Sequence, residues 1–330
     1  MEYQTDIYNH MLEVQQETSC DAHMIDLQPE LEWHMRPFLL DFLVESHLGL
    51  QLNPETLFLA VNIIDRYASK RVIYKRHYQL VACSSLWIAS KYQDKKSRIP
   101  TLQELNMLCC GAYENHMFVQ MESHILSTLE WTVGRPTEDL FVDMYLSDYP
   151  EDPKTVKVIK NIALYVCELA MFHKSLLIFP SSVIASCASD LAGLIYNSIS
   201  NYGYHNIFRC QSVSSTLPQS GSESQCMDLL ANALLYPSAC LQRKYTRPQF
   251  GGAYTLVANF LAMKAATAKS GMDSPVSVMT LNTPPSPQET ISTPRYVPQM
   301  MAKTQVPQVH SLGQNPYYMT PPVSPGDVFV

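Results

Sequence analysis

The amino-acid sequence predicts an all-α protein with two helical domains and a disordered C-terminal tail. Apolar residues recur at helical spacing through most of residues 31–268, and helix-start signals precede several of these stretches. No segment has the convincing alternation of apolar and polar residues that a half-buried strand would require. With 330 residues and a hydrophobic fraction of 46%, the chain is long enough to build two packed units.

The first domain is expected at residues 31–135, after a polar N-terminal arm at residues 1–30 that forms an extended segment or a short helix. Its first helix starts near His34, because Pro37 is tolerated only in the first helical turn. Apolar residues at positions i, i+3, i+4 and i+7 predict one buried face for this helix. They are Met35, Phe38, Leu39 and Phe42.

Four more helices are expected in the same domain. Asn53-Pro54 is typical of a helix start, with proline in the first turn. Residues 78–92 predict a third, central helix. Thr101 and Glu104 have the spacing of a capping box and begin the fourth helix, and residues 113–129 predict the fifth. Five helices without strands indicate a helical bundle.

Residues 136–268 are predicted to form the second helical domain. The Ser- and Gln-rich segment that ends at residue 226 predicts a loop within it, at residues 205–226. The tail at residues 269–330 contains 11 of the 22 prolines and few clustered large apolar residues, so it is predicted to be disordered. Apolar stretches indicate helices around residues 140–144, 159–172, 181–191, 227–235 and 253–266.

Composition excludes several classes of function. A net charge of −7 argues against a protein held to nucleic acid by broad electrostatics and favours a protein partner. The nine cysteines contain no C-x-x-C pair and no His/Cys spacing for a metal, so we expect no disulfide framework, no metal and no cofactor. Without a signal peptide or a membrane-length apolar run, we expect a soluble intracellular protein. No phosphate-binding loop or catalytic motif indicates an enzyme.

Two charged residues stand on otherwise apolar helix faces. Arg36 lies on the first helix and Asp65 on the second, and each is flanked by apolar residues. A buried charge is costly unless it is paired, so we expect these two side chains to form an ion pair. The alternative is two independent surface charges.

Several segments together resemble the cyclin box, at the spacing of that family and across about a third of the chain. The resemblance implies a five-helix bundle that is repeated twice. It also implies a regulatory subunit, not an enzyme, that binds and activates a cyclin-dependent Ser/Thr kinase in G1 or at the G1/S transition. The matching segments are Met35 to Glu45, Glu55 to Tyr67, Leu80-Val81 and Ile88 to Tyr92. Arg36-Pro37, Lys75 to Val81 and Lys91 to Arg98 further resemble G1-type cyclins of fungi.

By the same resemblance, Lys91 and Glu122 form the polar centre of a kinase-facing surface. Arg36 and Asp65 become the internal ion pair of the family, with Leu80 packed nearby. From the residues alone, Lys91 and Glu122 have the alternative of a solvated pair at helix ends. Apolar contact with the kinase is expected from Ile88, Tyr92, Leu126, Trp131 and Val133.

A second surface matches the family's substrate-docking patch. An exposed apolar groove with a carboxylate at its rim can capture a short motif that carries leucine and a basic residue. Kinase substrates and inhibitors are therefore expected partners. At helical spacing, at least two of these side chains are expected to fill the core instead. The patch consists of Met35, Phe38, Leu39, Phe42, Glu45 and Gln79.

Six Ser-Pro or Thr-Pro pairs make the tail a candidate control element. Residues 281–286 and 319–324 resemble phosphodegrons that an F-box ubiquitin ligase reads, because each phosphate adds nearly two negative charges for an arginine cluster. The alternative is that these pairs, which are common in Pro-rich tails, are unused. The candidate phosphorylation sites are Ser274, Thr283, Ser286, Thr293, Thr320 and Ser324.

Two other functions stay open. A transcription-factor core built from the same bundles would bind DNA and polymerase machinery and should carry a continuous basic surface. A transcriptional or nutrient-signalling cyclin would act outside the cell cycle. The locally basic residues 66–98 favour a solvated face, ahead of contact with a phosphorylated partner or a weak nuclear import signal. We expect the protein in the nucleus and the cytoplasm.

Overall fold

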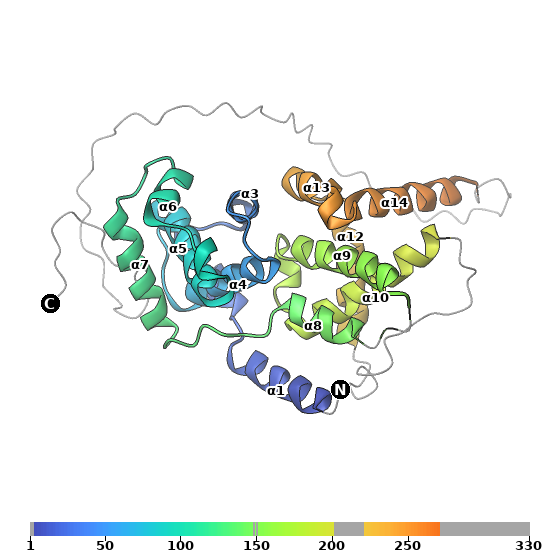
Figure 1. Cartoon of the computed structure of the whole chain (residues 1–330), viewed down its shortest axis with the longest axis horizontal. Helices are drawn as coiled ribbons and strands as arrows, with labels where there is room; N and C mark the ends of the chain where they lie inside the picture. The colour runs from blue at the N-terminus through green and yellow to red at the C-terminus, as the bar shows by residue number, and fades with distance from the viewer. Residues whose placement is uncertain (1–2, 148, 150, 201–220, 271–330) are drawn as a thin grey trace, which may run out of the picture.

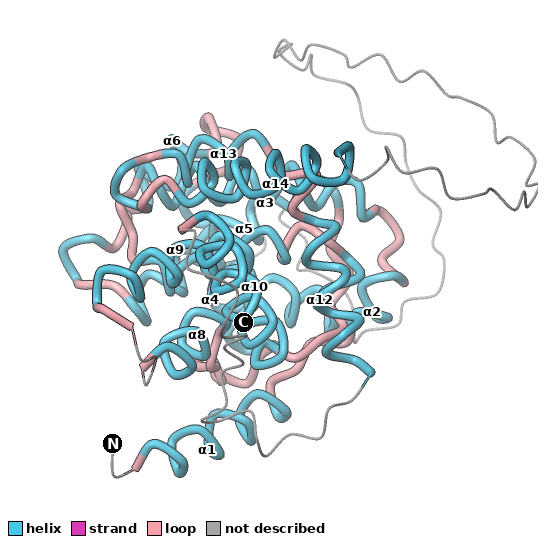
Figure 2. The backbone as a smooth tube through the Cα atoms, turned by 90° about the vertical axis from the view of Figure 1, so that its right-hand side faces the viewer, coloured by secondary structure: helices cyan, strands magenta, loops and turns pink. Residues whose placement is uncertain are grey.

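The computed structural model describes residues 3–147, 149, 151–200 and 221–270. Their regular elements are α-helices and short 3-10 helices joined by loops, as Figure 2 shows. The predicted all-α class is thereby confirmed. In Figure 1 the helices of residues 36–128 form one group, and the described helices within residues 138–200 and 221–270 form a second group beside it. Within the described residues, no helix has both the length and the apolar character for a membrane crossing.

The first group contains the five helices expected from the sequence, each within a few residues of its predicted bounds. Its central helix is α5, which packs against three of the others. Every residue from Leu80 to Ser90 of that helix is buried, and small residues such as Ser84 and Ala89 let the neighbouring helices approach closely. The helices are α3 (Arg36–Gly49), α4 (Pro54–Lys70), α5 (Tyr78–Gln93), α6 (Leu102–Leu108) and α7 (Asn115–Thr128).

The hydrogen-bond donors at the start of α4 find their acceptor in a residue that is distant in sequence. Asn53 occupies the N-cap position, but its side chain makes no cap hydrogen bond. The carboxylate of Asp94 instead accepts a hydrogen bond from the Asn53 N–H, at 3.0 Å, and another from the Thr56 hydroxyl. Asp94 follows the end of α5, so it joins that end to the first turn of α4 and supplies the negative charge that a helix N-terminus favours.

The predicted capping box at the start of α6 is present. Thr101 Oγ1 accepts a hydrogen bond from the Glu104 N–H at 3.3 Å, and Glu104 Oε2 accepts one from the Thr101 N–H at 2.7 Å. This reciprocal pair satisfies two donors that the first helical turn otherwise leaves free.

The second group is arranged around its long helix α10 (Ser181–Ile199), which packs against four other helices of the group, α8, α9, α12 and α14. The apolar run in the second half of α9 is buried without a break from Ile162 to Ala170. The helices are α8 (Glu138–Leu146), α9 (Pro153–Ala170), α10 (Ser181–Ile199), α12 (Gly221–Ala233), α13 (Ala239–Thr246) and α14 (Ala253–Ser270).

Three details of the second domain differ from the sequence prediction. Residues 221–226 belong to α12 rather than to the loop expected at 205–226, because Cys226 and Leu230 give this polar segment a buried face. Residues 205–220 lie outside the described residues. The last helix continues to Ser270, two residues into the expected tail, and the short helix α13 was not predicted.

The N-terminal arm is helical and packs on the second domain. Helix α1 (Gln4–Glu17) lies beneath α8 in Figure 1. The hydroxyls of Tyr8 and Tyr145 are 3.3 Å apart, and the Gln15 side chain forms two hydrogen bonds with Ser182, at 3.1 and 2.8 Å. A second short helix, α2 (Ala22–Asp26), packs against α4. Residues 3–26 therefore connect the two domains.

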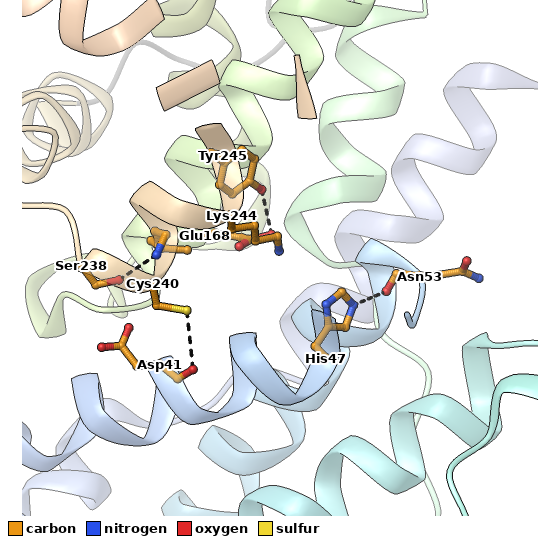
Figure 3. A network of polar contacts seen from close by, with 9 residues as sticks. Asp41, His47, Asn53, Glu168, Ser238, Cys240, Lys244 and Tyr245 are labelled. Carbon is orange, nitrogen blue, oxygen red and sulfur yellow. Dashed lines mark hydrogen bonds and ion pairs between the residues drawn. The ribbon is translucent and has the colours of Figure 1, made fainter. Parts of the chain in front are cut away.

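A buried polar network lies where α13 packs against α3 and α9 (Figure 3). Lys244 and Glu168 are each 1% exposed and form an ion pair, and the Tyr245 hydroxyl donates a second hydrogen bond to the same carboxylate at 2.8 Å. Nearby, His47 Nε2 lies 2.7 Å from the main-chain oxygen of Asn53. Burial and the charge of Lys244 lower the pKa of His47 to about 3.

Candidate functional site

Lys91 and Glu122 meet at the exposed edge between α5 and α7. Lys91 Nζ donates to both carboxylate oxygens of Glu122, at 2.6 and 2.8 Å. The same ammonium lies 3.2 Å from the centroid of the Trp87 ring. The Lys91 side chain is 37% exposed. The Glu122 side chain is 16% exposed. A partly exposed ion pair adds only modest stability, so its groups are available to a partner at moderate cost.

Two large exposed aromatic side chains belong to the same two helices and their ends: Tyr92 follows Lys91 in α5, and Trp131 lies just after α7. Tyr92 is 60% exposed and Trp131 is 69% exposed, while Leu126 and Val133 are half-buried. Ile88 differs from the expectation for this surface, because it is only 4% exposed. It belongs to the run of α5 that neighbouring helices surround, so its side chain fills the core.

The backbone after α7 turns Trp131 outward. Glu130 and Trp131 both have positive φ angles, 53° and 61°, which non-glycine residues rarely adopt. The Trp131 N–H donates to the main-chain oxygen of Leu126 at 2.9 Å and holds this turn. Strained, left-handed residues of this kind are concentrated at functional sites.

Gly134 belongs to the same surface, although sequence reasoning missed it. A Cβ atom at this position would lie 2.3 Å from the hydroxyl oxygen of Tyr92. The absence of a side chain therefore lets the Tyr92 phenol rest on the main chain after Trp131. The only sequence signal was a glycine between two apolar segments.

The ion pair of Arg36 and Asp65 is present and buried. Its two parallel hydrogen bonds measure 2.5 and 2.8 Å, and both side chains are about one-twentieth exposed. A third bond runs from Arg36 Nε to the main-chain oxygen of Met171, at 2.8 Å. Burial opposes the charge of Arg36, but the carboxylate of Asp65 outweighs it and raises the Arg36 pKa. Leu80 is fully buried in the same bundle.

The residues of the expected docking patch divide into exposed and buried ones. Phe38 is 74% exposed, and Met35, Phe42 and Gln79 are half-buried. Leu39 is buried and belongs to the core. The half-buried Phe42 packs against the same core, so at least two side chains of the patch contribute to the core.

Glu45, the rim carboxylate of the patch, has a partner within the chain. Arg243 of α13 forms an ion pair with it across the two domains, 198 residues away in sequence. Both side chains are more than half exposed. The carboxylate is thus partly neutralised by the second domain.

The six candidate phosphorylation sites of the tail lie outside the described residues.

Comparisons with known proteins decide the family. Residues 6–134 match the family model for the N-terminal domain of cyclins. The chain is 34% identical over 258 residues to cyclin puc1 of Schizosaccharomyces pombe, an alignment that covers 74% of this chain and 68% of that protein. The chain belongs to the cyclin family.

Other relatives of this cyclin agree with that assignment. It is 47% identical over 208 residues to the G1/S-specific cyclin CCN1 of Candida albicans, which covers 58% of this chain but only 30% of the relative's length. The structure resembles that of a viral cyclin from herpesvirus saimiri, with a TM-score of 0.56 at 18% identity, over 71% of this chain and 97% of the viral one. That likeness supports the fold.

Proposed function

We propose that this cyclin is the regulatory subunit of a cyclin-dependent Ser/Thr kinase, which it binds and activates in G1 or at the G1/S transition. The observation that carries the proposal is the partly exposed Lys91–Glu122 pair between α5 and α7, with the solvent-exposed aromatic side chains Tyr92 and Trp131 at the ends of the same helices. The likeness to a G1/S-specific cyclin supports the stage.

The chemistry of this surface suits a helix of the kinase. A lysine ammonium can donate to main-chain oxygens that a helix C-terminus leaves free, and a carboxylate can accept from the free N–H groups of an N-terminus. In the free chain these two groups satisfy one another. When the kinase binds, Lys91 and Glu122 would replace their mutual ion pair with hydrogen bonds to main-chain groups of the kinase, and the interface would shield these bonds from water.

The exposed aromatic side chains would supply most of the apolar contact. Tryptophan and tyrosine are enriched among the residues that dominate binding energy at interfaces, because they bury a large area with few rotatable bonds. Trp131 is held outward by its left-handed backbone and Tyr92 rests on Gly134. Both side chains are thereby oriented before a partner arrives, which lowers the entropy cost of binding.

Further parts of the proposal concern substrates, turnover and location. The docking patch around Phe38 and Phe42 would select substrates and inhibitors of the kinase. The Ser-Pro and Thr-Pro sites of the tail would be phosphorylated and then bound by an F-box ubiquitin ligase. The protein would act in the nucleus and the cytoplasm.

Deletion of residues 271–330 tests the proposed turnover. A longer cellular half-life of the truncated protein supports the proposal, and an unchanged decay rate contradicts it.

The decisive experiment is co-purification with cyclin-dependent kinases of the cell-cycle and transcriptional types, followed by a kinase assay. The Lys91→Ala/Glu122→Ala variant should bind the cognate kinase at least about tenfold more weakly, a loss near 1.4 kcal/mol. Lys160→Ala/Asp143→Ala is the matched control, because it removes an exposed ion pair of 2.5 Å on the second domain.

The outcomes separate the parts of the proposal. If wild type activates no kinase, the function is wrong. If only a transcriptional kinase is activated, the alternative of a transcriptional cyclin replaces the G1 assignment. If both double variants bind as well as wild type, the kinase contact lies on another surface.

A further inference from the structure

Two thiols from different helices are in contact inside the first domain. Cys83 lies in the middle of α5 and Cys109 at the end of α6, 26 residues apart in sequence. Their sulfur atoms are 3.3 Å apart, and both residues are buried. Both are free thiols in the structure. A disulfide bond measures about 2.05 Å, so a shift of little more than 1 Å separates this pair from a covalent link.

The pair lies directly beneath an exposed turn. Cys109 is 3% exposed, and the three residues that follow it, from Cys110 to Ala112, are exposed. Cys110 and Gly111 have positive φ angles, and four main-chain hydrogen bonds close the turn. Local opening of a single short turn is among the least costly motions of a folded protein. A small, uncharged oxidant can therefore reach Cys109 without unfolding of the bundle.

We propose that Cys83 and Cys109 form a redox-active dithiol that peroxide oxidises to an intramolecular disulfide. The Cys109 thiolate attacks one peroxide oxygen, which yields a sulfenic acid and hydroxide. The Cys83 thiol then attacks the sulfenic sulfur, the S–S bond forms, and water leaves. In total, two thiols and one hydrogen peroxide molecule give one disulfide and two water molecules.

The electrostatics of the pair agree with this order of events. The hydrogen bond with Cys109, and then burial, raise the pKa of Cys83, while the same hydrogen bond lowers the pKa of Cys109. Cys109 is thus the thiol that ionises first, and it is also the one nearer the surface. The neighbouring Cys110 is exposed, so it competes with Cys109 for the oxidant.

The test uses the full reduced chain, hydrogen peroxide as the oxidant and N-ethylmaleimide as the quench. Peptide mapping without reduction should find the peptide of Cys83 joined to that of Cys109, with the loss of two hydrogen atoms and reversal by dithiothreitol. Because Cys109 and Cys110 share one tryptic peptide, variants must assign the partner. The link should persist in Cys110→Ser and vanish in Cys109→Ser.

A second readout does not depend on the variants. The oxidised wild type should melt at a higher temperature than the reduced protein, because the link closes a loop of the unfolded chain. The proposal is overturned if folded wild type forms no such link, if the link needs denaturant, or if it persists in Cys109→Ser and vanishes in Cys110→Ser. If Cys109→Ser fails to fold, a link that persists in Cys110→Ser still assigns the partner, because Cys109 is then the one cysteine left on the shared peptide.

Discussion

Arg36 donates hydrogen bonds to both carboxylate oxygens of Asp65 and, through Nε, to the main-chain oxygen of Met171. The first two bonds join α3 to α4 within the first domain. The third reaches the end of α9 in the second domain. One buried cation therefore holds three helices of both domains together.

Replacement of Asp65 by alanine should strongly destabilise the protein. The guanidinium of Arg36 would remain buried without its counter-charge, which costs about 3 to 5 kcal/mol. Urea denaturation monitored by circular dichroism measures the loss. Asp143→Ala is the control, because it breaks an exposed pair with Lys160 and should cost less than about 1 kcal/mol. Equal losses in the two variants would contradict the argument from burial.

His47 should make the folded state sensitive to acid. Its pKa is about 3 in the folded chain against an ordinary value of 6.5, so between these values the unfolded chain binds more protons. The stability contribution is complete above pH 6.5 and is lost as pH falls toward 3, with a slope of at most about 1.4 kcal/mol per pH unit.

The His47→Gln variant tests this dependence, because it removes one titrating group. Its free energy of unfolding should fall less steeply than that of wild type between pH 6.5 and 4. His124, whose pKa burial lowers to about 4, acts in the same direction, so the readout is the difference between variant and wild type. His10→Gln, on an exposed side chain, is the control. Identical slopes for all three proteins would exclude the proposed role of His47.

Gly134→Ala should weaken kinase binding without unfolding the domain. The new methyl group would displace the Tyr92 phenol, which lies 2.3 Å from the Cβ position, and so disturb the aromatic side of the proposed kinase surface. Gly49→Ala is the matched control, because a Cβ there meets no atom within 4 Å. Affinity for the purified kinase distinguishes them, with a several-fold loss expected only for Gly134→Ala. A similar affinity for both variants would show that the position of Tyr92 is unimportant.

Arg243→Ala should change which peptides the docking patch prefers. Loss of this exposed pair should alter stability by less than about 1 kcal/mol. The released Glu45 carboxylate would then attract a basic residue in a leucine-containing peptide. Fluorescence polarisation with a peptide pair that differs by one Arg→Gln change should reveal a larger preference for arginine in the variant. The added change Glu45→Gln should abolish that gain. A preference that does not change would mean that Arg243 leaves the carboxylate accessible.

The sequence was most informative where the signal is local. Pro54, the capping box at Thr101 and the apolar spacing of α3 each lie within one or two helical turns, so the five helices α3 to α7 of the first domain were predicted closely. Arg36 and Asp65 were predicted as a pair because each charge interrupts an apolar face. The first six residues of α12 were missed, since Cys226 is the first buried residue of the helix and the five residues before it are polar or glycine.

Contacts between distant segments left no such signal. Glu45 with Arg243 and Glu168 with Lys244 join residues 198 and 76 positions apart. Glu168 interrupts an apolar stretch, but nothing along the sequence indicates Lys244 as its partner. The burial of Ile88 depends on how many helices surround α5, which spacing along α5 does not reveal. The partners of Asp94 and the contact between Gly134 and Tyr92 likewise depend on the assembled fold.

The docking of α1 on the second domain sets an order of events during synthesis. Tyr8 and Gln15 leave the ribosome early, but their partners Tyr145 and Ser182 follow 137 and 167 residues later. Contacts of such long range form late, after the loops between them have closed. The first helix therefore stays undocked until α8 and the start of α10 have emerged, so its attachment marks a chain whose first domain has been synthesised in full and whose second domain has begun to assemble.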